Sequence, residues 1–314
     1  MPNVLQSILV STDGSETATL AVRAASEISS GTGARLHLVH VWQGAPPVRT
    51  IADEPVREPE QEAIELLRRQ EWQAKTAGAT VIEKHLRAGR PAEEIAALSE
   101  EVGADLIVVG SRKMGTLGRL VLGSVSREVV RGASRPVLIV GGGWPPSRVL
   151  VGDDLSEEAG LAGELAAIIG GLYKAPVRLT TAYPPDNRYL SYAANRRRTG
   201  ETERSIGQAL RARAAVIGHA LEETPHTEVA PRDPGHVLQG TEGTLVAVGR
   251  RGLGALKRAV LGGVSDDVLR TAGGPVLIAP AKRGSRGAGP TRALPQHGSH
   301  PGRASSPSGT GRTG

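Results

Sequence analysis

Residues 110–140 read GSRKMGTLGRLVLGSVSREVVRGASRPVLIV, and residues 249–279 read GRRGLGALKRAVLGGVSDDVLRTAGGPVLIA. At a constant offset of 139 residues, the two stretches share 17 identical residues in 31 aligned positions. Unrelated stretches would share about two. The chain therefore contains an internal repeat, and a repeat decides how every other part of the sequence is interpreted.

A second match shows that the repeat extends over a whole structural unit. Residues 8–15, ILVSTDGS, align with residues 149–156, VLVGDDLS, at an offset of 141. Because the offset changes by only two residues between the ends of the unit, one complete unit was duplicated. The length of 314 residues agrees with this, since it suits two domains of ordinary size.

Each unit alternates strand-like and helix-like patterns. In the first unit the expected strands are 4–10, 36–42, 80–86, 106–110 and 137–140, and the expected helices are 16–30, 59–77, 91–102 and 124–133. Gly31 and Gly33 are expected to end the first helix, and Ser15 to cap its start. Five strands that alternate with helices predict an α/β fold with a doubly wound parallel sheet, of strand order 2-1-3-4-5 or 3-2-1-4-5.

The second unit follows the same plan, with a strand expected at 178–183 and a helix at 206–221. Prolines 225, 231 and 234 crowd the region of its third helix, so that helix should be short or irregular. We expect domain 1 at residues 1–141, domain 2 at 147–281, and a disordered C-terminal tail at 282–314.

The basic character of the chain belongs to this tail. The formal net charge is +6, and residues 282–314 hold six basic residues and no acidic ones, so the rest balances to zero. Their Gly, Ser and Pro-rich composition cannot form a core. Nucleic acid binding is therefore not expected, apart from weak contact by the tail, because aromatic residues for base stacking amount to 2%.

Cysteine is absent, which excludes disulfides, thiolate metal sites and thiol nucleophiles. The first residues lack the pattern of a signal peptide, and no apolar run approaches the length of a membrane helix. We therefore expect a cytoplasmic protein with no membrane partner. The eight histidines show no metal-binding spacing, and His37 and His40 are expected to flank a strand of the sheet.

The glycine-rich loops after the fourth strand of each unit are candidate anion sites. Glycine lets backbone N–H groups approach a phosphate, and the following helix presents its positive end to it. Asp13 and Asp154 follow the first strands, at the same edge of the sheet, where ligands bind parallel α/β folds. Neither loop has the Walker sequence, and no dinucleotide fingerprint follows the first strand.

The segments ILVSTDGS, Gly-Ser-Arg-x-x-Gly, LGSVS and RPVLIV resemble those of the universal stress protein family. The resemblance covers residues 4–140 well and 148–280 less completely. It implies two tandem Rossmann-like domains, each a five-stranded parallel sheet of order 3-2-1-4-5 with helices on both faces. It also implies a stress-response protein that binds ATP with Mg²⁺ and is not an enzyme beyond slow ATP hydrolysis.

Carried over position by position, the resemblance assigns nucleotide contacts in both units. In the first unit they are Asp13, Val41, Gly110, Lys113, Gly123, Ser124 and Val125. In the second they are Asp154, Ala182, Gly249, Gly252, Gly262, Gly263 and Val264. The two aspartates are also the candidate Mg²⁺ contacts.

Three positions depart from the family pattern. Lys113 replaces the second glycine of the first loop. Its long cationic side chain either blocks the loop or contacts the phosphate. In the second unit Gly263 replaces a Ser or Thr, and Leu155 replaces the glycine after the aspartate. Which unit binds nucleotide therefore stays open.

The same residues also have simpler structural interpretations. Asp13 and Asp154 also suit simple turns, and the loop glycines also suit tight turns and helix packing. The rival function is an interaction scaffold of the same fold that binds no nucleotide. The resemblance further implies that the fifth strands, 137–140 and 276–279, pair the two units within the chain, which would cover two exposed edges. A homodimer of the whole chain stays open.

Overall fold

The computed structural model describes residues 5–42, 59–111, 122–183, 199–219, 221, 223–250 and 262–280. We call residues 5–140 the first half and residues 148–280 the second half. The tail predicted at 282–314 lies outside the described residues.

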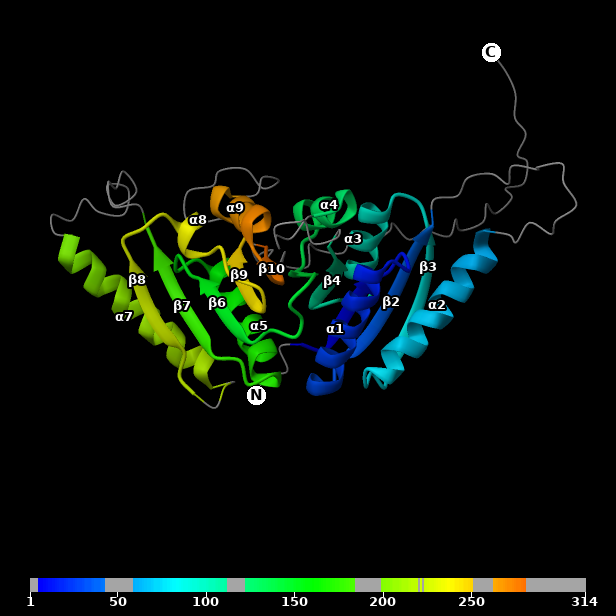
Figure 1. The fold of residues 1–314 in the computed structure, drawn as a ribbon, viewed down its shortest axis with the longest axis horizontal. Helices are drawn as coiled ribbons and strands as arrows, with labels where there is room; N and C mark the ends of the chain where they lie inside the picture. Colours follow the sequence, from blue (N-terminus) through cyan, green and yellow to red (C-terminus); the bar gives the residue numbers. More distant parts are fainter. Residues whose placement is uncertain are drawn as a thin grey trace, which may run out of the picture. The chain divides into compact units, whose positions relative to one another are not determined.

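The described chain alternates strands and helices, as predicted for an α/β fold (Figure 1). The first half contains β1 (Ser7–Ser11), α1 (Glu16–Thr32), β2 (Arg35–Trp42), α2 (Pro59–Thr76), β3 (Ile82–Ala88), α3 (Pro91–Glu101), β4 (Leu106–Gly110), α4 (Ser124–Gly132) and β5 (Val137–Val140). The second half contains β6 (Arg148–Gly152), α5 (Glu157–Leu172), β7 (Val177–Ala182), α7 (Thr199–Gly218), β8 (His226–Ala230), α8 (Pro234–Val237), β9 (Thr244–Gly249), α9 (Gly263–Thr271) and β10 (Val276–Ala279).

The sheet confirms the order 3-2-1-4-5 in each half. All neighbours within a half run parallel, and the two halves meet where β5 pairs antiparallel with β10. The result is one ten-stranded sheet rather than two separate sheets, with β3 and β8 at its outer edges (Figure 1). The strand order reverses direction between β1 and β4, and between β6 and β9, the points at which ligands bind in folds of this kind.

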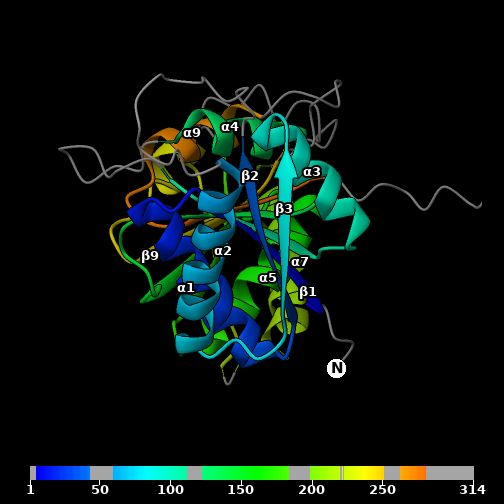
Figure 2. The same cartoon turned by 90° about the vertical axis from the view of Figure 1, so that its right-hand side faces the viewer.

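Helices cover both faces of the sheet, as predicted. The buried aliphatic side chains of α1, α2, α5 and α7 form one layer, and those of α3, α4 and α9 form the other. Figure 2 shows this at the β3 edge, where α2 and α3 lie on opposite sides of the strand. Among the described helices, none is both long enough and apolar enough to cross a bilayer.

The short third helix of the second half is confirmed, because α8 has 4 residues between Pro234 and Val237. The expected end of the first helix is half right: Gly33 is its C-cap with φ of 75°, whereas Gly31 lies inside α1. A Cβ at Gly31 would lie 2.5 Å from Leu172 Cδ2 in the second half, so the leucine side chain would have to shift.

Glu27 of α1 joins the first half to Tyr173 of the second half. Its carboxylate accepts hydrogen bonds from Tyr173 Oη at 2.7 Å and from Trp144 Nε1 at 2.9 Å, and Arg23 Nε donates to it at 2.8 Å. Partial burial alone would raise the pKa of Glu27, but these donors hold it below its ordinary value. The ionised carboxylate is therefore part of the folded structure.

We expect Glu27→Ala to destabilise the protein by about 2 kcal/mol, because it leaves two partly buried donors without an acceptor. Because the pKa of Glu27 is lower in the folded than in the unfolded protein, its carboxylate stabilises the fold at pH values above about 4.3, the ordinary glutamate pKa. This contribution disappears as the pH falls through the folded-state pKa. Urea unfolding at pH 7 and pH 3.5 checks both statements. Glu164 of α5 is exposed and provides the control: Glu164→Ala should change stability by less than about 0.5 kcal/mol at either pH. Equal losses for the two variants would contradict this role of Glu27.

Candidate nucleotide-binding site

The corner between β1 and α1 positions Asp13 at the carboxyl edge of the sheet. Ser15 caps α1 by accepting from the Ala18 N–H, as predicted, and the exposed Asp13 accepts from the Ser15 N–H at 3.0 Å through Oδ1. Gly14 has φ of 79°, the left-handed conformation that glycine adopts without strain. Asp13 thus makes the turn contact of the simpler interpretation, while its carboxylate stays open to solvent.

The first helical turns of α1 and α4 converge on Gly110, the last residue of β4. A Cβ added to Gly110 would lie 2.8 Å from the Thr17 carbonyl carbon and oxygen and 2.9 Å from the Ala18 nitrogen. On the α4 side, the Ser126 hydroxyl donates to the Gly110 carbonyl oxygen at 2.6 Å. One glycine therefore brings both helix N-termini together beside the reversal of strand order between β1 and β4.

Among the described residues, no side chain caps the N-terminus of α4. Gly123 is its N-cap in an extended conformation, with φ of −67° and ψ of 163°, and having no side chain it caps none of the first N–H groups. Ser124 is exposed and Val125 half-buried. The first-turn N–H groups and the helix dipole favour an anion here.

The end of β2 is attached to the same corner. His40 contacts the Thr12 carbonyl oxygen through Nδ1 at 2.8 Å. The aligned contact in the second half is made by the Thr181 hydroxyl, which donates to the Asp153 carbonyl oxygen at 2.6 Å. Val41 and Ala182, the predicted adenine contacts, follow these residues and are half-buried.

In the second half, α9 contacts the end of β9 in the same way as α4 contacts the end of β4. Gly262 is the N-cap of α9, and the Ser265 hydroxyl donates to the carbonyl oxygen of Gly249 at 2.7 Å. Gly263 and Val264 are exposed in the first turn of α9, and a Cβ on Gly263 would meet nothing within 4 Å. The missing hydroxyl at Gly263 therefore reflects no lack of space.

Two predicted contacts, Lys113 and Gly252, lie outside the described residues. Ser126 and Ser265 were missed by the sequence interpretation, although their identity in both copies of the repeat was a signal. His40 and Thr181 gave no such signal, because the aligned positions carry different side chains for the same contact.

The corner after β6 differs from its counterpart because it contains a buried ion pair. Asp153 has a fully buried side chain and pairs with Arg213 of α7 at 2.7 Å. Arg213 also donates to the carbonyl oxygens of Ser156 at 2.9 Å and Leu155 at 3.3 Å. Burial raises the pKa of Asp153 above its ordinary value, while the Leu155 amide and Arg213 act in the opposite direction. Arg213 therefore spans the corner at which Asp154 stands.

In the first half the corresponding space is filled by neutral groups. Asp153 aligns with Thr12, which is not charged. Gln70 of α2 donates to the Thr19 hydroxyl at 3.1 Å. The residue aligned with Thr19 is Gly160, where a Cβ would be 3.4 Å from the guanidinium carbon of Arg213. Glycine thus leaves room for the arginine in the second half alone.

Leu155 keeps the backbone of the glycine that it replaces. Its φ is 68°, close to the 79° of Gly14. A non-glycine residue in this region costs about 1 to 2 kcal/mol. Asp154 accepts from both the Ser156 N–H and its hydroxyl, so the turn survives the substitution. The leucine side chain packs partly against the core, where the first half has none.

Comparisons with known proteins agree with this duplicated fold. The family model of the universal stress protein family matches residues 5–141 and again 146–280. A universal stress protein of Thermus aquaticus is 39% identical over 144 residues, covering 44% of this chain and 99% of the relative. One from Mycolicibacterium smegmatis is 28% identical over 303 residues, covering 86% of this chain and 96% of the relative.

A solved structure supports the fold over nearly the whole described chain. The crystal structure of a universal stress protein from Archaeoglobus fulgidus has a TM-score of 0.63 and 22% identity, covering 89% of this chain and 99% of the other. The fold is thus shared with a protein of known structure.

Proposed function

This chain belongs to the universal stress protein family, and from that premise we propose that its first half binds an adenine nucleotide, specifically ATP with Mg²⁺, as a regulator in the stress response. The observation that carries the proposal is the convergence of the α1 and α4 N-termini on Gly110, beside the exposed carboxylate of Asp13. Backbone donors at a helix start suit phosphate oxygens, and a nearby carboxylate suits ribose hydroxyls or Mg²⁺.

The proposal assigns the residues of the first half to different parts of the nucleotide. The N–H groups of Ser124 and Val125, with the Ser124 hydroxyl, hold phosphate, and Gly123 keeps their approach clear. Val41 contacts the adenine at the end of β2. Asp13 meets the ribose or the Mg²⁺ ion, and Lys113 is assigned to the phosphates.

The second half is proposed to bind nucleotide weakly or not at all. Arg213 already supplies a cation to its corner and closes it from α7, and Leu155 adds a side chain where the first half has Gly14. In this proposal the nucleotide contacts assigned to the second half are secondary. They are Asp154, Ala182, Gly249, Gly252, Gly262, Gly263 and Val264.

We further propose the division into domains at 1–141 and 147–281 with a separate tail, a cytoplasmic location, and a chain whose halves act as an internal pair through β5 and β10. The bound state rather than turnover is the proposed signal. Light scattering after size-exclusion chromatography distinguishes a single chain from a homodimer.

Calorimetric titration with ATP and Mg²⁺ tests the binding. We expect Gly123→Val to weaken ATP binding by more than about tenfold, which corresponds to about 1.4 kcal/mol, because the added side chain covers the first-turn N–H groups. The extended backbone of Gly123 accepts valine without strain. The matched control is Gly262→Val at the same place in the second half, which should change the affinity by less than about twofold.

The two variants also separate the rival interpretations. Loss of binding in Gly262→Val alone would reverse the assignment of the halves. If wild-type protein binds no adenine nucleotide, the scaffold function replaces this one.

A further inference from the structure

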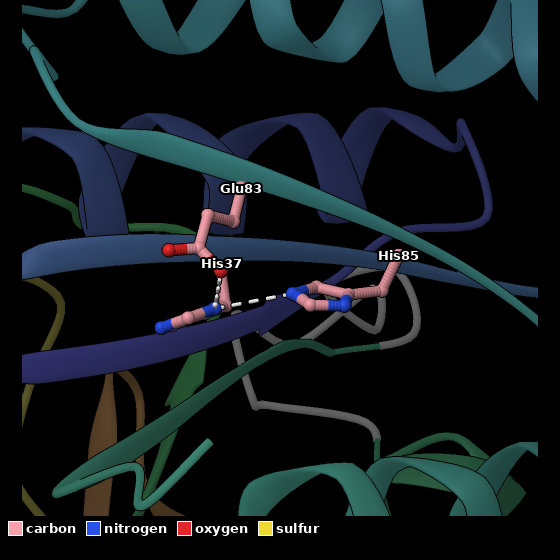
Figure 3. A group of neighbouring side chains, drawn as sticks. All are labelled: His37, Glu83 and His85. Atoms are coloured by element: carbon pink, nitrogen blue, oxygen red, sulfur yellow. Dashed lines mark hydrogen bonds and ion pairs between the residues drawn. The ribbon is translucent and has the colours of Figure 1, made fainter. Parts of the chain in front are cut away.

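Two histidines and a glutamate meet at the outer edge of the first half, away from the nucleotide crevice. His37 lies on β2, and Glu83 and His85 lie on β3 (Figure 3). The parallel register pairs His37 with Glu83 and Val39 with His85, so the three side chains share one face of the sheet.

The separations of their polar atoms fit one metal ion. His37 Nδ1 lies 3.1 Å from His85 Nε2 and 3.6 Å from Glu83 Oε2 (Figure 3). All three donor atoms lie within 4.8 Å of one another. Atoms bound tetrahedrally to one Zn²⁺ ion at about 2.0 to 2.1 Å are about 3.3 Å apart.

The protonation of the cluster leaves a place for a cation. A neutral imidazole ring has one lone pair, on the nitrogen that carries no proton. Only one proton fits between His37 Nδ1 and His85 Nε2. A divalent ion would take the place of that proton once each ring carries its own proton on the other nitrogen, so that His37 Nδ1 and His85 Nε2 both offer a lone pair beside the Glu83 carboxylate.

The second half fills the equivalent place with a cation of its own. Arg178 aligns with His37 at the offset of 141, and the β7–β8 register pairs it with His226. Its guanidinium lies 3.5 Å from Glu228, which stands where His85 does in the first half. The duplicated unit therefore carries an arginine–carboxylate pair here, and the first half carries three metal-type ligands instead.

The cluster of His37, Glu83 and His85 is buried on one side and open to solvent on the other. His37 is 2% exposed and fixes one side of the site, whereas the Glu83 side chain is 48% exposed and leaves the other side open to solvent. Arg35 lies 3.5 Å from Glu83 Oε1, the oxygen that does not face His37, and so holds the carboxylate in place.

We propose that His37 Nδ1, His85 Nε2 and Glu83 bind a divalent transition-metal ion of the Zn²⁺ class, with water in the fourth position. Two imidazoles and one carboxylate are a ligand set that Zn²⁺ accepts, and they suit Mg²⁺ poorly. The bound ion would link the edge strand β3 to β2.

Titration of the full-length protein with Co²⁺, followed by its visible absorption, tests this proposal. We expect one equivalent to give the intense bands of a tetrahedral ion and Zn²⁺ to displace it. His85→Gln should weaken the apparent Co²⁺ affinity by at least about tenfold, and so should Glu83→Gln, which alters an exposed side chain. Zn²⁺ should also raise the melting temperature of wild-type protein more than that of Glu83→Gln.

The matched control is His226→Gln, which removes a histidine from the equivalent strand of the second half and should leave the Co²⁺ affinity unchanged. Circular dichroism checks that His85→Gln is folded, and Glu83→Gln decides the matter if it is not. Wild-type and Glu83→Gln titrations that coincide, or an equal loss in His226→Gln, would overturn the site.

Discussion

Gly110→Ala should lower the stability of the protein by about 2 kcal/mol, although it adds a single methyl group. The new Cβ would lie 2.8 Å from backbone atoms of Thr17 and 2.9 Å from the Ala18 nitrogen, inside normal contact distance. Backbone cannot rotate away as a side chain can, so α1 must move off the end of β4. Urea unfolding followed by circular dichroism measures this loss.

Gly132→Ala is the matched control, because Gly132 is the last residue of α4 and a Cβ there meets nothing within 4 Å. It should leave stability unchanged or raise it by up to about 1 kcal/mol. If both variants unfold at the wild-type urea concentration, Gly110 does not hold the helix N-termini together.

Arg213→Met should destabilise the protein by about 3 kcal/mol at pH 7, because it leaves the carboxylate of Asp153 buried without its cation. The pKa of Asp153 is already raised by burial, and losing Arg213 raises it further. A raised carboxyl pKa favours the folded state below the unfolded pKa, and this contribution is lost as the pH rises through the folded value. The destabilisation should therefore be smaller at pH 4 than at pH 7.

Two further variants isolate the ion pair. Adding Asp153→Asn to Arg213→Met should recover part of the lost stability, since the unpaired charge is gone. In the first half, Gln70→Met removes the neutral counterpart and should cost about 1 kcal/mol without a pH dependence. Equal losses for Arg213→Met at both pH values would contradict a charge-based role.

The architecture could be predicted because the repeat carries it in local patterns. The aliphatic runs at 106–110 and 137–140 became β4 and β5 with those bounds, and Ser15 became the cap of α1. The prolines after 224 correctly signalled the short α8. Such features depend on residues close together in the chain, which a single sequence displays directly.

The missed features depend on pairings between distant segments. Arg213 and Asp153 are 60 residues apart, and only the rotation of α7 turns the arginine to the corner. His37 and His85 are 48 residues apart, and the β2–β3 register alone brings them to 3.1 Å. His37 was predicted to flank a strand but lies within β2, and the pattern of an apolar strand gave no sign of its partner.

The sequence predicted a site in each half, and the difference between the two corners comes from side chains on separate elements. Thr12 and Thr19 in the first half align with Asp153 and Gly160 in the second, and Gln70 contacts Thr19 whereas Arg213 lies against Gly160. No single substitution predicts the closed corner, because the glycine matters only when the arginine lies over it.

Hydrogen exchange with and without ATP and Mg²⁺, read by mass spectrometry on the intact chain, tests most directly whether the first half holds the nucleotide. ATP should slow the exchange of amides at 122–130 and at the β1–α1 corner, and change those at 262–270 little. Equal protection in both halves, protection of 262–270 alone, or none at all would contradict the assignment.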